Sequence, residues 1–305
     1  MSQPKQLVIL SGKGGTGKTS LTAAFAHLAT SDAQGGLRLV LVDADVDAAN
    51  LELVLAPELM AATDFIGGST VTIDAERCGA CGLCVEACRF EALSMPEDGQ
   101  PPWVDIVACE GCAACVYRCP NAAMHMQPQL AGQWFRSATR YGPLIHAALR
   151  PGQQNSGKLV TLVKQQARLL ALDEGYPLVL VDGPPGIGCP VISAVAGADL
   201  VLIVTEPTVA GRHDLDRALQ TVRHFKLRAV VCINKADLSP PGTQDILDYC
   251  HAHQVEVIGH IPFDTVVTEA MVAGVPLTAY TDGTVAQAVR HIWRRLLAEL
   301  QLDGA

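Results

Sequence analysis

Two runs of four cysteines constrain this chain of 305 residues more than any other feature of its sequence. In each run, three cysteines are separated by two residues each, and a fourth follows after three more: Cys78, Cys81, Cys84 and Cys88, then Cys109, Cys112, Cys115 and Cys119. This spacing lets three thiolates of one run bind three irons of a 4Fe–4S cluster, while the fourth thiolate comes from the other run. We therefore assign Cys78, Cys81, Cys84 and Cys119 to one cluster, and Cys109, Cys112, Cys115 and Cys88 to the other. Paired cysteines of this kind also bind structural zinc, an alternative that the duplicated three-plus-one spacing disfavours.

Residues 72–128, which contain both cysteine runs, are expected to form a small ferredoxin-like domain. The segment is rich in turn residues and has little apolar periodicity, so its core is too small to fold without the clusters. Residues 1–71 and 129–305 would then form one larger domain in two parts, with the ferredoxin-like domain inserted between them.

Composition excludes several classes of protein. The chain is 49% hydrophobic and 17% charged, typical of a well-buried globular protein. Its 22 basic and 31 acidic residues give a net charge of −9, which disfavours a nucleic-acid partner. No stretch approaches the ~18 consecutive apolar residues of a membrane span, and the first apolar run is too short for a signal peptide. Three further cysteines outside the runs fit a reducing compartment, so we expect a cytoplasmic protein.

Short apolar runs alternate with helical stretches along the remainder of the chain. Runs without polar alternation, interleaved with helices, predict an α/β fold with a doubly wound, mostly parallel sheet. The expected strands are 7–10, 37–42, 178–181, 200–204, 229–233 and 255–261, and the expected helices 19–30, 158–173, 212–225, 243–253 and 264–273. Residues 133–149 are interpreted as a hairpin, and 284–300 as a terminal helix whose apolar stripe docks on the sheet. A membrane-surface helix is the alternative for 284–300, but we do not expect membrane association.

A glycine-rich loop between the first strand and the first helix predicts a phosphate site. It consists of Gly12, Lys13, Gly14, Gly15, Thr16, Gly17, Lys18 and Thr19, with Ser20 next in the helix. Glycines let backbone N–H groups converge on phosphate oxygens, Lys18 would contact the β- and γ-phosphates, and Thr19 would offer its hydroxyl to Mg²⁺.

The early lysine of this loop, Lys13, gives it a family resemblance. The loop resembles the deviant Walker A loop of the MinD, Mrp and nitrogenase-iron-protein class of ATPases, which form ATP-sandwich dimers. The resemblance implies that the chain forms a homodimer on binding ATP, and that Lys13 reaches the partner's nucleotide, a role like that of an arginine finger.

Other motifs of that class follow in order. The segment from Asp43 to Leu51 resembles the first switch, which implies Asp43 near Mg²⁺ and Asp45 acting on the attacking water. The segment from Asp182 to Gly186 resembles the Walker B strand and second switch, which implies Asp182 near Mg²⁺. Asn234 would contact adenine, and Pro262 and Asp264 belong to a loop resembling the one that packs on the base. Asn234-Lys235-Ala236-Asp237 could be mistaken for a guanine-specificity element, but the resemblance favours ATP.

Cys189 stands just past the second switch, in Gly188-Cys189-Pro190. This spacing resembles the nitrogenase iron protein, where the cysteine helps to bridge a cluster between subunits, and it implies an interface thiol. A second bridging cysteine has no counterpart here, so a buried or helix-starting thiol remains the alternative. Cys232 and Cys250 are expected in the core.

The whole pattern is similar to MinD-superfamily P-loop ATPases that carry an inserted ferredoxin domain. We interpret the chain as a dimeric ATPase with ATP, Mg²⁺ and two 4Fe–4S clusters as cofactors and Lys13, Lys18 and Asp45 as catalytic residues. Its nucleotide state would control electron transfer to an unknown redox partner. Two alternatives remain: an iron–sulfur carrier or assembly scaffold, and a MinD-like positioning or scaffold ATPase.

Overall fold

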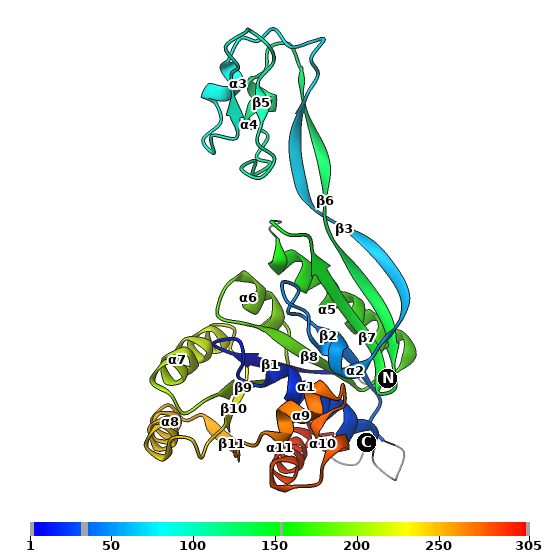
Figure 1. Cartoon of the computed structure of the whole chain (residues 1–305), viewed down its shortest axis with the longest axis vertical. Helices are drawn as coiled ribbons and strands as arrows, with labels where there is room; N and C mark the ends of the chain where they lie inside the picture. The colour runs from blue at the N-terminus through cyan, green and yellow to red at the C-terminus, as the bar shows by residue number, and fades with distance from the viewer. Residues whose placement is uncertain (1–2, 32–35, 153–154, 303–305) are drawn as a thin grey trace. The chain divides into compact units, whose positions relative to one another are not determined.

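The computed structural model describes residues 3–31, 36–152 and 155–302, which form two compact units (Figure 1). The first, here called the sheet unit, comprises Met1–Thr63, Trp134–Ala148 and Ser156–Ala305. The second, the cysteine unit, comprises Asp64–Gln133 and Leu149–Asn155. Each is described by itself.

The sheet unit is built on parallel strands, as the apolar runs predict. These strands are β1 (Lys5–Ser11), β2 (Leu39–Asp43), β7 (Gly142–Leu149), β8 (Leu178–Pro185), β9 (Leu200–Thr205), β10 (Ala229–Asn234) and β11 (Glu256–Ile261). They lie in the order β11, β10, β9, β1, β8, β2, β7, and every neighbouring pair is parallel. The order places β1 and its following loop at the centre of the sheet.

Helices cover both faces of the sheet, so the predicted α/β fold is confirmed. One group packs with the N-terminal helix: α1 (Lys18–Thr30), α2 (Leu51–Leu55), α9 (Val266–Val272), α10 (Leu277–Tyr280) and α11 (Thr284–Leu300). Leu7 and Ile9 of β1 belong to the core under this group, whereas Val8 and Leu10 point the other way and are also buried. That second face is covered by α5 (Ser156–Glu174), α6 (Cys189–Val195), α7 (Val209–His224) and α8 (Pro240–Ala252).

The terminal helix α11 docks on the sheet unit, as expected from its apolar stripe. Val289, Ile292 and Leu296 are fully buried, and the ring of Trp293 stacks on Phe25 of α1 with centroids 5.2 Å apart. The stripe is therefore core and not a membrane-facing surface. Across the described ranges, no helix is long and apolar enough to span a membrane.

Two long strands extend the sheet beyond β7. β6 (Met124–Thr139) joins β7 through a turn at Gly142, whose φ of 140° suits glycine, and so forms the predicted hairpin. β3 (Glu58–Ile73) lies outside β6, and contacts from Thr72 to His125 and from Gln133 to Asp64 show that the two run antiparallel. The expected boundaries at 72 and 128 fall inside these strands, whereas the cysteine unit begins at Asp64. The first seven residues of β3 are exposed, so their sequence carries no alternation of apolar and polar residues that would have indicated a strand.

The cysteine unit consists of two similar halves. The first contains α3 (Leu83–Glu86) and β4 (Leu93–Ser94), and the second contains β5 (Trp103–Val104) and α4 (Ala114–Arg118), with β4 antiparallel to β5. Its small core includes Val71, Cys84, Leu93, Cys115 and Met124.

Backbone hydrogen bonds join the start of each half to the end of the other half. The N–H of Asp74, before the first cysteine run, donates to the carbonyl of Ala123, and the N–H of Asp105, before the second run, donates to the carbonyl of Ala92. Each half therefore ends beside the beginning of the other. This arrangement places the fourth cysteine of each run near the first three cysteines of the other run.

Candidate functional site

The loop from Gly12 to Gly17 turns directly from the end of β1 into α1. Gly15 and Gly17 have φ angles of 78° and 94°, which only glycine adopts without strain. A Cβ atom on Gly17 would lie 2.6 Å from the side-chain amide of Asn234. That amide donates to the carbonyl of Thr16 at 2.8 Å and so ties the loop to the end of β10. The loop is thus held with little room for any other residue at position 17.

Replacing Gly17 by alanine should therefore lower the stability of the nucleotide-free protein by about 1–3 kcal/mol, through left-handed strain and displacement of Asn234. Thermal unfolding followed by circular dichroism measures this. Gly14→Ala is the matched control, because a Cβ on Gly14 would contact nothing within 4 Å. Equal melting temperatures for the two variants would contradict the proposed constraint at Gly17.

Lys18, the first residue of α1, lies buried beneath the loop. Its Nζ donates to the hydroxyl of Ser11 at 2.9 Å. Burial lowers the pKa of Lys18, whereas the carboxylates of Asp182, Asp45 and Asp43 raise it. The ammonium group therefore lies among the acidic residues that the sequence assigns to the switches.

Asp43 ends β2, and its register partner Asp182 lies near the carboxyl end of the adjacent parallel strand β8. Both carboxyl groups are buried, and burial together with their proximity to one another raises the pKa of Asp43; burial raises that of Asp182. The hydroxyl of Thr19 donates to Asp182 at 2.7 Å. Two buried carboxylates beside a hydroxyl form an oxygen donor set that suits Mg²⁺, because a divalent cation relieves their repulsion.

The rest of the segment predicted as the first switch wraps around Asp43. One oxygen of its carboxylate accepts the N–H of Asp45 at 3.1 Å, and the other accepts the N–H groups of Asn50 and Leu51 at 3.1 and 3.0 Å. Asp45 itself is half-buried; burial raises its pKa, and Lys18 lowers it. The backbone thus fixes Asp45 beside both Lys18 and the paired carboxylates.

The segment predicted as the second switch, residues 182–186, includes the end of β8 and contacts the end of β1. The N–H of Gly186 donates to the carbonyl of Ser11 at 3.1 Å. A Cβ on Gly183 would lie 2.6 Å from the carbonyl oxygen of Ile9, so the strands approach too closely there for a side chain. A movement of the loop after β1 would therefore displace the segment that leads into α6.

Cys189 begins α6 and is exposed, whereas Cys232 and Cys250 are buried as expected. A Cβ on Gly157, at the start of α5, would lie 3.3 Å from the Cβ of Cys189. At the other end of α6, the buried Lys164 of α5 donates to the carbonyls of Ser193 and Ala196 at 3.1 and 2.8 Å. Helix α5 thus contacts both ends of α6, which the sequence alone did not indicate.

A cavity of about 160 Å³ lies beside the loop at the end of the sheet. The predicted residues Ser20, Asn234, Pro262 and Asp264 all line it, together with Gly17, Lys235, Phe263 and buried apolar residues of α10 and α11. The carboxylate of Asp237, which a guanine-specific site would use for the base, accepts the backbone N–H of Phe263 at 2.6 Å. That contact uses one of the two carboxylate oxygens of the side chain that would distinguish guanine.

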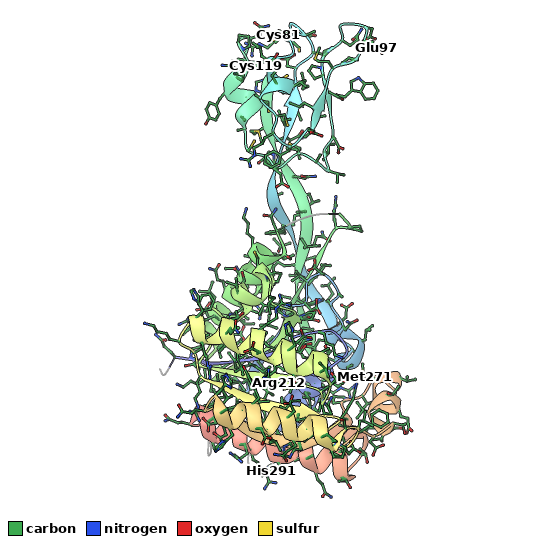
Figure 2. The ribbon with its side chains drawn as sticks, turned by 90° about the vertical axis from the view of Figure 1, so that its left-hand side faces the viewer. Cys81, Glu97, Cys119, Arg212, Met271 and His291 are labelled. Atoms are coloured by element: carbon green, nitrogen blue, oxygen red, sulfur yellow. The ribbon has the colours of Figure 1, made fainter. Side chains whose placement is uncertain are left out.

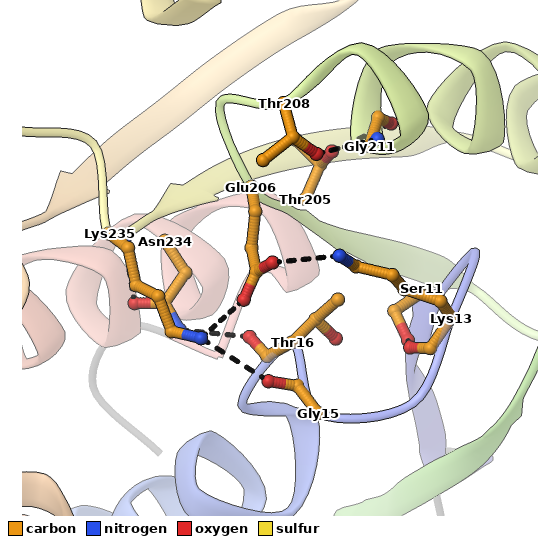
Figure 3. A network of polar contacts seen from close by, with 10 residues as sticks. All are labelled: Ser11, Lys13, Gly15, Thr16, Thr205, Glu206, Thr208, Gly211, Asn234 and Lys235. Carbon is orange, nitrogen blue, oxygen red and sulfur yellow. Dashed lines mark hydrogen bonds and ion pairs between the residues drawn. The ribbon is translucent and has the colours of Figure 1, made fainter. Parts of the chain in front are cut away.

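Lys13 does not project freely from the loop. Its Nζ lies 3.1 Å from Oε2 of Glu206, just after β9, and Nζ of Lys235 lies 2.5 Å from Oε1 of the same carboxylate (Figure 3). Sequence reasoning missed Glu206 and Lys235. The signal that could have indicated Glu206 is its position just after an apolar run, which it shares with Asp43, Asp182 and Asn234.

The second predicted cysteine set is gathered around one small cavity of the cysteine unit. Cys88, from the first run, lines it together with Cys109, Cys112 and Cys115 from the second run. The remaining lining is largely apolar and includes Val71, Phe90, Leu93 and Met126. The structure thus brings together four thiols that the sequence assigned to one cluster.

Residues of the first set also approach one another, from both halves of the cysteine unit. Burial, and to a smaller extent the neighbouring Cys78 and Cys81 thiols, raise the pKa of Cys84. The sulfur of Cys119 accepts the N–H of Ala123 at 3.3 Å. A Cβ on Gly79 would lie 2.8 Å from the amide of Asn121, so the start of the first run approaches the end of the second (Figure 2).

The turns before each run were also missed. The carboxylate of Asp74 accepts the N–H of Glu76 at 3.0 Å, and that of Asp105 accepts the N–H of Val107 at 2.9 Å. An aspartate four residues before the first cysteine of each run was visible in the sequence as the signal for both turns. These turns fix the backbone from which Cys78 and Cys109 project.

In the part of the chain that the structure describes, no group of three or more His, Cys, Asp or Glu residues is arranged to hold a single metal ion. A 4Fe–4S cube takes one thiolate per iron, so its ligands surround it and do not converge on one point. The two sets of four thiols, in partly apolar surroundings, match the donor chemistry of such a cube.

Comparisons with known proteins agree with the geometry of the sheet unit. The profile of the family described as CobQ/CobB/MinD/ParA nucleotide binding domain matches residues 7–277. An uncharacterised protein of Methanocaldococcus jannaschii is 28% identical over 291 residues, covering 95% of this chain and 96% of that protein. The septum site-determining protein MinD of Bacillus subtilis is 27% identical over 299 residues, covering 96% of this chain and 89% of MinD.

A solved structure shares the fold. The septum site-determining protein MinD from Pyrococcus horikoshii, complexed with Mg-ADP, has a TM-score of 0.60 at 20% identity and covers 98% of both chains. The family profile spans the phosphate loop, the segments 43–51 and 182–186, and most of the lining of the 160 Å³ cavity. The chain therefore belongs to the CobQ/CobB/MinD/ParA family of nucleotide-binding proteins, as a MinD/ParA-type P-loop ATPase.

Proposed function

We propose that the protein is a MinD-like ATPase that binds Mg-ATP, pairs with a second copy in the ATP state and recruits a partner protein in that state. The observation that carries this proposal is the convergence of Lys18, Thr19, Asp43 and Asp182 at the carboxyl ends of adjacent strands. A buried ammonium, a hydroxyl and two buried carboxylates together suit a polyphosphate and its magnesium ion.

Each residue of the site has a part in the proposed reaction. Backbone N–H groups of the loop from Gly12 to Gly17 and Lys18 would bind the phosphates, while Thr19, Asp43 and Asp182 would hold Mg²⁺. Asp45 would orient the attacking water and accept its proton. The base would occupy the cavity lined by Ser20, Asn234, Pro262 and Asp264.

Exposed apolar side chains support pairing of two copies at this edge of the sheet. Ile192, Val209, Leu238 and Phe263 follow β8, β9, β10 and β11 in turn, and all four are exposed. Large apolar side chains exposed to solvent favour a protein interface. In the pair, Lys13 would cross to the nucleotide of the other copy.

The relatives favour positioning or scaffolding over electron transfer as the use of this ATPase. Septum site-determining proteins are prominent among them, and none of the names cited above is that of a redox protein. We therefore assign recruitment of a partner as the proposed output of the ATP state, the alternative that the sequence ranked lower.

The cysteine unit supports a second candidate, in which nucleotide state controls electron transfer. We propose that Cys78, Cys81, Cys84 and Cys119 bind one 4Fe–4S cluster, and Cys109, Cys112, Cys115 and Cys88 the other. Such clusters supply one-electron redox chemistry when bound, and burial of their thiolates tunes the potential. Each set of four cysteines draws ligands from both halves of the unit. This arrangement favours clusters that stay bound over clusters that are passed on to another protein.

One experiment separates the two candidates. In protein with loaded and reduced cysteine units, we expect equal rates of oxidation by a small-molecule acceptor in the ADP state and in an ATP-trapped state, with ATP-driven dimerisation independent of redox state. Stopped-flow absorbance and light scattering measure these quantities. A change of about fivefold or more in the oxidation rate between states would instead favour nucleotide-controlled electron transfer.

A further inference from the structure

Glu206 lies between two lysines that come from different loops. Only 10% of its side chain is exposed, and its two oxygens contact Nζ of Lys13 at 3.1 Å and Nζ of Lys235 at 2.5 Å (Figure 3). Burial raises the pKa of Glu206, but hydrogen bonds from Lys235 and Lys13 lower it further, so the pKa lies below its ordinary value. One ionised carboxylate is therefore shared by two ammonium groups.

The two lysines are held to different degrees. The Lys235 ammonium also approaches the carbonyl of Gly15 at 3.5 Å, and its neighbour Asn234 donates to Thr16, so this strand end is anchored to the loop twice. The Lys13 side chain is more exposed, at 41% against 32%. Lys13 is thus the partner that can leave the carboxylate more easily.

We infer that Glu206 is a positioning residue that holds Lys13 within its own subunit until a second ATP-bound copy offers phosphate charge, while Lys235 keeps the carboxylate paired once Lys13 has left. This inference rests on the proposed ATP-dependent pairing. A buried carboxylate left without any cation would oppose the exchange strongly. Lys235 removes that penalty, so Lys13 can transfer from a carboxylate in its own chain to a polyphosphate in the other.

Two substitutions should act in opposite directions. Glu206→Gln removes the charge that holds Lys13, whereas Lys235→Met leaves Lys13 as the sole cation on Glu206 and strengthens its hold. A half-exposed ion pair shifts an equilibrium by about two- to fivefold. Because both copies must release Lys13, the dissociation constant of the ATP-bound dimer should fall by about four- to twenty-fivefold in Glu206→Gln and rise in Lys235→Met.

The measurement is analytical ultracentrifugation at saturating Mg-ATP, with Mg-ADP affinity determined separately by calorimetry to account for any change in nucleotide binding. Glu206→Asp, which keeps the charge, should behave more like the wild type than Glu206→Gln does. In a Lys13→Ala background, Glu206→Gln should no longer strengthen the dimer, because the released group is absent.

A purely structural role for Glu206 would weaken the dimer in both variants, and that result would overturn the inference. So would an unchanged dimer in Glu206→Gln, or a strengthened dimer that persists in the Lys13→Ala background. If the wild type itself does not dimerise with ATP, the proposed function fails, and the inference falls with it.

Discussion

Asp45→Ala should slow ATP hydrolysis by at least about a hundredfold and cause the ATP-bound dimer to accumulate. The backbone N–H of Asp45 is bonded to Asp43, so the side chain is fixed beside the paired carboxylates and Lys18. Burial raises the pKa of Asp45 toward the range in which a carboxylate accepts a proton more readily. The substitution would take away the proposed base while leaving in place the residues proposed for phosphate and magnesium.

Phosphate release measures the rate, and size-exclusion chromatography with light scattering measures the dimer. Asp47→Ala is the matched control, since Asp47 lies in the same segment but is exposed; its rate should stay within about threefold of the wild type. An Asp45→Ala protein that hydrolyses ATP normally would exclude this residue as the catalytic base.

Anaerobically purified protein should contain about eight irons and about eight acid-labile sulfides per chain, held by the two cysteine sets. Cys88→Ser and Cys112→Ser should each lower the iron content to about four, because each removes a ligand from the same cluster. The double variant should also retain about four. If Cys88 instead served the cluster of its own run, the double variant would lose nearly all iron.

Iron and sulfide analysis with low-temperature EPR decides between these outcomes. Cys189→Ser, an exposed cysteine outside both runs, is the control and should retain all the iron. Further loss in that variant would indicate a cluster shared between copies. Stoichiometric zinc without sulfide, in protein never exposed to oxygen, would rule out the cluster assignment.

Strand ends explain why so much of the nucleotide site was predictable from sequence. In a parallel sheet, the carboxyl ends of the strands meet at one edge, so residues directly after apolar runs, such as Asp43, Asp182 and Asn234, come together without further information. The glycine spacing of the loop adds the phosphate-binding backbone. These signals are local in the sequence, and the parallel fold determines where the residues lie in space.

Features that depend on long side chains or on exposed backbone were not predictable in this way. The sharing of Glu206 by Lys13 and Lys235 requires knowing which of several rotamers each lysine adopts across three loops. Strand β3 and the part of β6 before residue 133 were missed, because the first seven residues of β3 are exposed and β6 shows no regular alternation of buried and exposed residues. The expected limits of the cysteine unit, residues 72 and 128, therefore differ by several residues from the observed limits at Asp64 and Gln133.

The antiparallel pairing of β3 with β6 has a consequence for how the chain can evolve. The N–H of Asp74 bonds to the carbonyl of Ala123, so the roughly 50 residues between the two strands leave and return at neighbouring positions. The entropic cost of closing so long a loop grows only with the logarithm of its length, and the pairing of β3 with β6 offsets it. A tight turn could close the same ladder. The residues between Asp74 and Ala123 could therefore be replaced by a short turn while the pairing of β3 with β6 is kept.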